Sequence, residues 1–135
     1  MHVQAHRTPF QVRDYECDLQ GVVNNAVYQN YLEHARHTYL LEQGIDFADL
    51  TQRGILLVVT RVELNYRKSL SSGDTFQVWT RVERLSRLKF GFHQKIVKEP
   101  EAIEVLHGLV TGTALNAQGR PEIPPSIDRL IPFSD

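Results

Sequence analysis

Alternating apolar and polar positions predict five β-strands along the chain. Residues 8–15 alternate for most of their length, which is typical of a half-buried strand. After an intervening helical stretch, four more segments carry strand-like patterns: residues 55–66, 76–82, 90–96 and 103–115. Turn-forming residues at positions 72–74 and 99–101 are typical of hairpins, so we expect neighbouring strands to run antiparallel.

One segment shows the periodicity of a long helix. Apolar residues recur every three or four positions over residues 27–43, and Asn24 or Asn25 can cap its start. Gly44 is well placed to end this helix, because glycine readily adopts the left-handed conformation that closes a helix. The apolar positions cover much of the circumference, so we expect other elements to wrap around the helix. A short second helix or turn is expected at residues 47–53.

This order of elements predicts an α+β domain in which a five-stranded antiparallel sheet curls around one central helix. The 135 residues suffice for a single domain with a real core, and no repeat or linker divides them. Four of the six prolines fall within residues 121–135. We therefore expect this end to be an extended tail that packs on the surface.

Composition narrows the functional classes. A net charge of −1 predicts neither a nucleic-acid partner nor binding to an anionic membrane. The single cysteine excludes an intramolecular disulfide and a cysteine-based zinc site. Residues 1–7 lack the apolar core of a signal peptide, and no apolar run approaches the ~20 residues that span a bilayer. We predict a cytoplasmic protein with no metal site and no cofactor.

Asp18 is the strongest candidate for chemistry. It lies where the first strand gives way to the long helix. Free N–H groups at a helix start can stabilise a developing oxyanion while the carboxylate attacks, or removes a proton from water. The alternative is an ordinary turn aspartate, which is the more frequent role for this residue type in a glycine-containing turn. The neighbouring residues reverse that preference.

Residues 12–28, which read VRDYECDLQGVVNNAVY, and residues 31–36, YLEHAR, carry a specific resemblance. They resemble the hotdog-fold acyl-CoA thioesterases of the 4-hydroxybenzoyl-CoA thioesterase family. Asn65-Tyr66, residues 70–74 and residues 119–124 agree with that family in the expected order. The resemblance covers nearly the whole chain. It implies a hotdog fold, thioester hydrolysis, and a homodimer or homotetramer in which strands of two sheets pair.

The resemblance also implies roles for individual residues. The family's catalytic carboxylate corresponds to Asp18, and the backbone N–H that polarises the thioester carbonyl corresponds to Asn25. Gly21 lets the backbone pass close to the acyl group, and Tyr28 is a core or acyl-pocket residue. Asp18 acts either as a nucleophile that forms an acyl anhydride or as a general base on water, and the sequence leaves both open.

The chain departs from one related branch. Acyl-ACP thioesterases with a similar run have a histidine at the position of Val22 and an asparagine at that of Gln20. Both are replaced here, so Asp18 is left as the main catalytic group. Another hotdog branch uses a glutamate on the helix, which makes Glu33 a weaker candidate. Glu33 and His37 also have the spacing of a metal pair, although such pairs are commonly surface ion pairs.

Basic residues before position 90 are candidates for binding CoA. In the resembling family a basic cluster at this strand junction contacts the CoA phosphates, and Arg87 and Lys89 match its position. The alternative is a solvated turn, and Arg67 and Lys68 are a second choice for the phosphates. Three other polar residues are expected to be structural: Cys17, His93 and His107.

We therefore predict an acyl-CoA thioesterase that hydrolyses an acyl-CoA to the free acid and CoA. An acyl-ACP thioesterase and a non-catalytic acyl-CoA-binding module of the same fold are the alternatives. The apolar strand at residues 55–59 is a suitable edge for pairing with a second subunit, because an unpaired apolar edge is otherwise an aggregation hazard.

Overall fold

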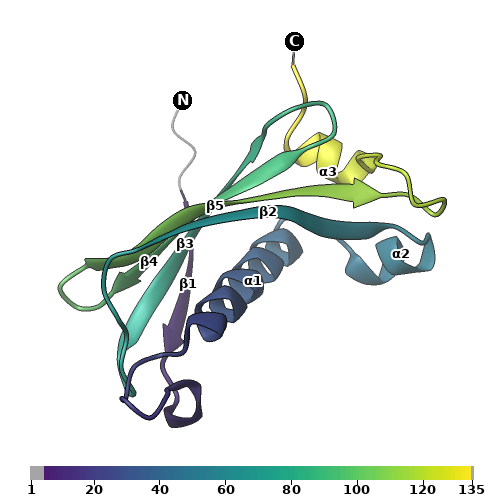
Figure 1. The fold of residues 1–135 in the computed structure, drawn as a ribbon. Coiled ribbons are helices and arrows are strands. Elements are labelled where there is room, and N and C mark those ends of the chain that lie inside the picture. Colours follow the sequence, from purple (N-terminus) through teal and green to yellow (C-terminus); the bar gives the residue numbers. More distant parts are fainter. Residues whose placement is uncertain (1–4, 135) are drawn as a thin grey trace.

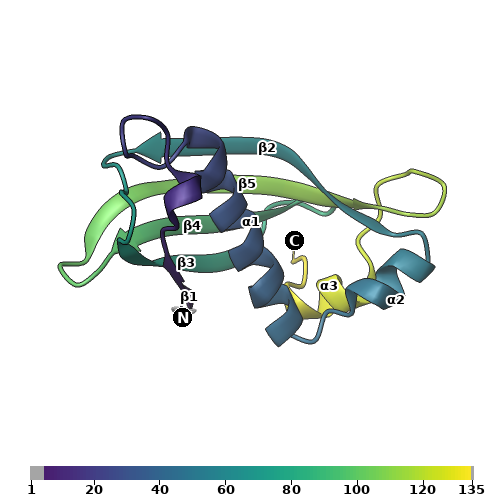
Figure 2. The same cartoon turned by 90° about the horizontal axis from the view of Figure 1, so that it is seen from below.

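The computed structural model describes residues 5–134 and confirms the predicted α+β architecture. Its elements are β1 (His6–Gln11), η1 (Asp14–Glu16), α1 (Asn25–Glu42), α2 (Phe47–Gln52), β2 (Leu56–Tyr66), β3 (Thr75–Arg84), β4 (Phe90–Lys98), β5 (Ile103–Leu115) and α3 (Pro125–Leu130). The strands form one antiparallel sheet in the order β1-β3-β4-β5-β2, which curves over α1 (Figure 1, Figure 2). Residues 1–4, within the N-terminal segment compared with a signal peptide, lie outside the described residues.

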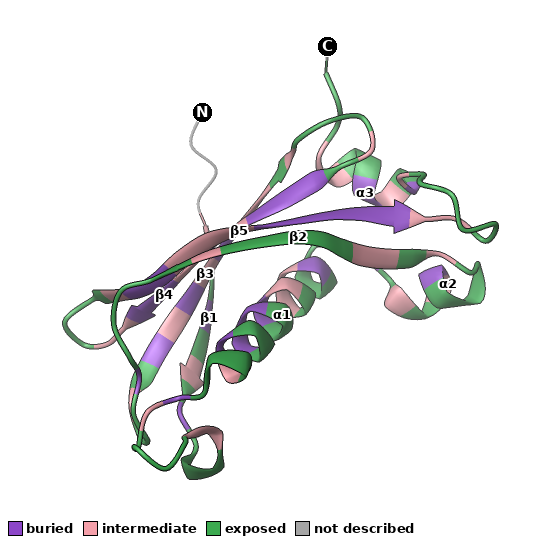
Figure 3. Ribbon diagram, in the orientation of Figure 1, coloured by how far each residue is buried: buried purple, intermediate pink, exposed green. Residues whose placement is uncertain are grey.

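Helix α1 begins and ends close to the predicted positions. The Asn24 side chain accepts a hydrogen bond from the N–H of Ala26 at 3.1 Å, and Gly44 has φ +85° just beyond the last turn. The sheet covers one side of the helix, and exposed residues follow the other side (Figure 3). Glu33 and Leu41 are among the exposed residues of α1. The helix is therefore covered on one side only. Its buried residues are Tyr28, Tyr31, Leu32, Ala35 and Leu40.

Strand β1 is shorter than predicted, because residues 14–16 form a 3-10 turn. The N–H of Arg13 donates to Glu16 Oε1 at 2.8 Å, and the N–H of Glu16 donates to the Arg13 carbonyl at 3.0 Å. These local hydrogen bonds replace cross-strand pairing. The chain therefore turns away from the sheet just before Asp18.

The two predicted hairpins have different outcomes. The turn at residues 99–101 joins the antiparallel neighbours β4 and β5, as predicted. The hairpin predicted at residues 72–74 is wrong, because β2 pairs with β5 whereas β3 pairs with β1 and β4. Gly73 donates its N–H to the Val12 carbonyl at 3.0 Å, and Val12 donates to the Asp74 carbonyl at 2.9 Å. This turn is held against the end of β1 instead.

The prediction of an extended C-terminal tail is also wrong, because residues 125–130 form α3. Pro125 lies in the first turn of a helix, where its missing N–H costs nothing. Ile127 is buried, and Arg84 donates to Asp128 Oδ1 at 3.0 Å and to the Ile131 carbonyl at 2.9 Å. Among the helices described, none is long and apolar enough to cross a membrane.

Candidate active site

Asp18 lies in a tight turn between η1 and α1. Its N–H donates to the Val22 carbonyl at 2.9 Å, and its Oδ1 accepts from the N–H groups of Gln20 at 2.9 Å and Val22 at 3.4 Å. Gly21 has φ +82°, a conformation that favours glycine. Oδ1 therefore holds the turn together. Within residues 5–134 no group hydrogen-bonds Oδ2, and the side chain is exposed, so the second oxygen is available for chemistry.

The turn faces a hollow of about 400 Å³ at the start of α1. The structure brings Asp18, Asn25 and Tyr28 together around this hollow, with Lys68 as its basic residue. Asn25 is the first residue of α1, where a backbone N–H has no partner inside the helix. A carbonyl oxygen bound near Asn25 meets both this N–H and the positive end of the helix dipole. The complete lining is Asp18, Val22, Val23, Asn24, Asn25, Tyr28, Tyr66, Lys68 and Ser69.

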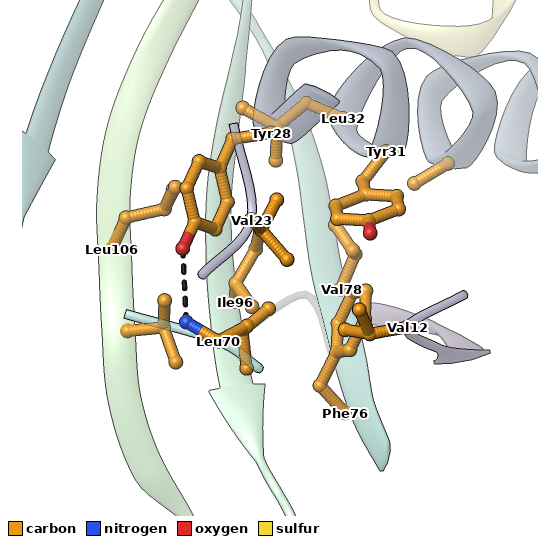
Figure 4. Close-up of a cluster of buried hydrophobic side chains, with 12 residues drawn as sticks. Val12, Val23, Tyr28, Tyr31, Leu32, Leu70, Phe76, Val78, Ile96 and Leu106 are labelled. Atoms are coloured by element: carbon orange, nitrogen blue, oxygen red, sulfur yellow. Dashed lines mark hydrogen bonds between the residues drawn. The ribbon is translucent and has the colours of Figure 1, made fainter. Parts of the chain in front are cut away.

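Tyr28 connects this hollow to the core. Its phenol oxygen accepts the N–H of Leu70 at 2.9 Å, and the Leu70 carbonyl accepts the N–H of Val23 at 2.8 Å (Figure 4). Only 3% of Tyr28 is exposed, and burial raises the pKa of its phenol, which stays neutral. Tyr28 is thus a core residue that also forms one wall of the hollow.

Tyr31 fixes the segment that leads into the Asp18 turn. Its hydroxyl donates to Glu16 Oε1 at 2.8 Å, and Glu16 also holds η1 through Arg13. Burial, and then the hydrogen bond to Glu16, raise the pKa of Tyr31. Cys17, next to Asp18, is partly buried and packs against the cluster of buried hydrophobic residues that includes Tyr28 and Tyr31. Its surroundings match the structural role predicted for it.

Arg87 and Lys89 lie far from Asp18 within one chain. They occupy the turn between β3 and β4, next to Phe90. Phe90 of β4 pairs with Gly112 of β5, and Gly112 pairs in turn with Val59 of β2, so the turn lies at the level of Val59. Tyr66, which lines the hollow, is about 23 Å farther along β2 at roughly 3.3 Å per residue. One subunit therefore does not bring these residues to the Asp18 turn.

A second cavity, the apolar cavity, has a volume of about 320 Å³ and lies between the C-terminal half of α1, α2 and the Leu56 end of β2. Glu33, Arg36 and His37 are its charged or titratable residues, so Glu33 does not share the hollow of Asp18. Among the described residues, no group of three or more His, Cys, Asp or Glu is arranged to hold a metal ion. Most of the wall is apolar, including Leu40, Phe47, Leu50, Leu57, Phe90, Phe92 and Val110.

The remaining histidine candidates lie outside both cavities. His107 Nδ1 is 2.9 Å from Glu104 Oε2, and His93 Nε2 is 3.6 Å from Glu83 Oε2. Arg36 was missed by the sequence reasoning. Residues 31–36 carry the family resemblance, but nothing in that run marks Arg36 as a cavity residue, because the cavity is assembled from two helices and three strands that are distant in the sequence.

Comparison with known proteins decides the family. Residues 12–131 match the thioesterase-like superfamily. The chain belongs to this superfamily. This thioesterase-like chain is similar to the acyl-acyl carrier protein thioesterase ATL2, chloroplastic, of Arabidopsis thaliana, with 36% identity over 121 residues that cover 90% of the chain. It spans 64% of the length of that plant protein.

In two further comparisons the matched residues cover most of this chain and most of the similar protein. The long-chain acyl-CoA thioesterase FadM of Escherichia coli (strain K12) is 32% identical over 105 residues, which are 78% of this thioesterase-like chain and 79% of that protein. The crystal structure of Slr0204, a 1,4-dihydroxy-2-naphthoyl-CoA thioesterase from Synechocystis, has a TM-score of 0.88 over 94% of this chain and 95% of that chain, at 15% identity. The predicted family and hotdog fold are confirmed.

Proposed function

We propose that the protein hydrolyses acyl-CoA thioesters to the free acid and CoA. The observation that carries this proposal is the Asp18 carboxylate, anchored through Oδ1 and open at Oδ2, beside the first N–H groups of α1. Similarity to FadM, a long-chain acyl-CoA thioesterase, supports the choice of CoA as the carrier. Similarity to ATL2 makes an acyl carrier protein the alternative.

Two reaction courses use the same groups. In the first, Asp18 Oδ2 attacks the thioester carbon, the CoA thiolate leaves, and water then opens the mixed anhydride. In the second, Oδ2 takes a proton from a water molecule as its oxygen attacks the same carbon; the C–S bond then breaks, and CoA leaves as the thiolate, which is protonated to the thiol. In both courses the carbonyl oxygen gains negative charge, which the N–H of Asn25 stabilises.

The test is the substitution Asp18→Asn with acyl-CoAs of short, medium, long and aromatic type. An asparagine keeps an oxygen that can accept the turn hydrogen bonds but cannot act as a base or a carboxylate nucleophile. We expect kcat to fall by at least about a hundredfold with unchanged thermal stability. Asp49→Asn, at a position that lines neither cavity, is the control. Hydrolysis that persists in Asp18→Asn contradicts the assignment.

Two comparisons separate this proposal from its alternatives. With the same acyl group on CoA and on an acyl carrier protein, faster turnover of the protein-bound thioester favours the carrier-protein enzyme. Stabilisation by acyl-CoA without any release of free thiol favours the non-catalytic binding module.

We also propose that the protein is a homodimer that pairs two copies of β2, with a tetramer as a dimer of dimers. β2 is the last strand of the sheet, and within residues 5–134 its outer edge pairs with no other strand. It is exposed along most of its length (Figure 3), and four of its apolar side chains are 41–57% exposed: Leu56, Val59, Val62 and Tyr66. A long apolar edge of this kind favours pairing with a second copy.

A two-fold axis pairs identical edges antiparallel, which sets the Tyr66 end of one strand beside the Leu56 end of the other. The hollow at Asp18 then lies next to the apolar cavity of the second subunit and on the side of its β3–β4 turn. This arrangement supports a role for Arg87 and Lys89 of the partner subunit in binding CoA phosphates. The cytoplasmic location stays a prediction based on composition.

A further inference from the structure

Arg36 projects from α1 onto the wall of the apolar cavity and is partly buried there. Its Nη1 donates to Gln94 Oε1 at 3.1 Å, and its guanidinium lies 6.0 Å from the ring centroid of Phe92. Burial lowers the pKa of this group from its ordinary value, which is the sign of a cation that has lost part of its hydration.

Gln94 is fixed in the orientation that presents its oxygen to Arg36. It is buried, and its Nε2 donates to the Leu32 carbonyl at 3.0 Å and to Thr80 Oγ1 at 3.1 Å. Because both amide hydrogens are used in this way, Oε1 must face the guanidinium. A hydrogen-bonded chain from the sheet therefore holds Arg36 in place.

Most donors of Arg36 have no hydrogen-bond partner in the part of the chain that the structure describes. A guanidinium carries five N–H groups, and one of its nitrogens is occupied by Gln94. Within residues 5–134 no carboxylate lies within 4.0 Å of it, although Glu33 is one turn away on the same helix. A partly buried cation with no carboxylate at ion-pair distance is costly, although Glu33 offsets part of that cost from one turn away, and a ligand that supplies an acceptor oxygen lowers it further.

The rest of the wall suits an apolar body. Aliphatic and aromatic side chains from α1, α2, β2, β4 and β5 line it, and its volume of about 320 Å³ is in the range of small-molecule sites. We propose that this cavity binds the acyl group of the substrate, and that Arg36 selects acyl groups that carry an oxygen acceptor on an otherwise apolar body. This inference rests on the thioesterase function and on the β2-paired dimer proposed above, which sets this cavity beside the Asp18 hollow of the other subunit.

Such an acceptor can come from two sources, a hydroxylated aromatic acyl group or an oxygenated aliphatic chain. The test compares kcat/KM within matched pairs that differ by one oxygen. The pairs are benzoyl-CoA with 4-hydroxybenzoyl-CoA, and decanoyl-CoA with 3-oxodecanoyl-CoA and with 10-hydroxydecanoyl-CoA. We expect the wild-type protein to prefer the oxygenated member of at least one pair by about tenfold, because a hydrogen bond to a charged donor adds to transition-state binding.

Arg36→Met keeps the apolar stem and removes the donors. We expect it to reduce the ratio of kcat/KM values between the oxygenated and the plain member of a pair to less than about twofold, and Arg36→Lys to retain part of the preference. Arg53→Met, on α2 and outside both cavities, is the matched control and should keep the full preference. A preference that survives in Arg36→Met overturns the inference.

The failure of this inference and the failure of the proposed function give different results. A wild-type protein that hydrolyses no thioester contradicts the proposed function. One that hydrolyses both members of every pair equally contradicts only the role of Arg36. If Arg36→Met does not fold, thermal shifts of the wild-type protein with decanoic and 10-hydroxydecanoic acid decide. A larger shift with the hydroxy acid supports the role, and equal shifts contradict it.

Discussion

The phenol oxygen of Tyr28 accepts the backbone N–H of Leu70 at 2.9 Å across the core, beside the hollow that Asp18 lines. Tyr28→Phe leaves this buried N–H without a partner. We expect the free energy of unfolding to fall by about 1–3 kcal/mol, measured by urea denaturation. Tyr39→Phe is the control, because no hydrogen bond engages the Tyr39 hydroxyl within the described residues. An equal loss in both variants would refute a special role for the Leu70 contact.

Gly21 provides a test that separates stability from activity. A Cβ at position 21 meets no atom within 4 Å, so Gly21→Ala acts through the backbone alone, at a cost of about 1–2 kcal/mol for φ +82°. Gly119 has φ +76° and equally open space, far from Asp18 in the turn after β5. We expect similar losses of stability in Gly21→Ala and Gly119→Ala, and a fall in kcat only in Gly21→Ala. Unchanged kinetics in both would show that the turn tolerates distortion.

The position of Arg87 and Lys89 predicts that two different impaired variants complement each other in a mixed dimer. We expect Arg87→Ala combined with Lys89→Ala to raise KM for acyl-CoA, with a weaker effect at high salt. The double variant and Asp18→Asn are then refolded together. If CoA is bound across subunits, each mixed dimer contains one intact site, which combines Asp18 of the double variant with Arg87 and Lys89 of the Asp18→Asn subunit. Random mixing then restores roughly a quarter of the wild-type sites. If all groups of a site came from one chain, the mixture would show no gain.

Tyr31 predicts a dependence of stability on alkaline pH. Its pKa is raised in the folded state, so above its ordinary value of ~10 the folded protein holds a proton that the unfolded chain has lost. Stability from this group is complete below pH ~10 and falls as the pH rises further. We expect Tyr31→Phe to flatten the decline in urea midpoint between pH 9 and 11. Tyr15→Phe, at a side chain that is 74% exposed, should leave the decline unchanged.

Local sequence was sufficient wherever the structure depends on local interactions. The cap at Asn24, the glycine at position 44 and the turn at Asp18 are each stabilised by residues only a few positions away. The extended tail was mispredicted because its prolines suggested only an irregular chain, whereas Pro125 starts a short helix and Ile127 finds a buried site on the sheet.

Interactions between distant segments account for the other differences. Nothing near residues 72–74 reveals that β5 takes the place beside β2. Arg36 looks like any helix residue until β4 brings Gln94 against it. The distance between Asp18 and Arg87 follows from the strand order, which depends on how five separate segments pair.

In the proposed mechanism the two oxygens of Asp18 have separate tasks, and this has an evolutionary consequence. Oδ1 organises the backbone, and asparagine can perform that task equally well. A single change between aspartate and asparagine at this position therefore leaves the scaffold and its cavities intact. Within such a lineage, a hydrolase and a protein that merely holds its ligand are one mutation apart. Activity can thus be lost, or regained, without passing through an unfolded intermediate.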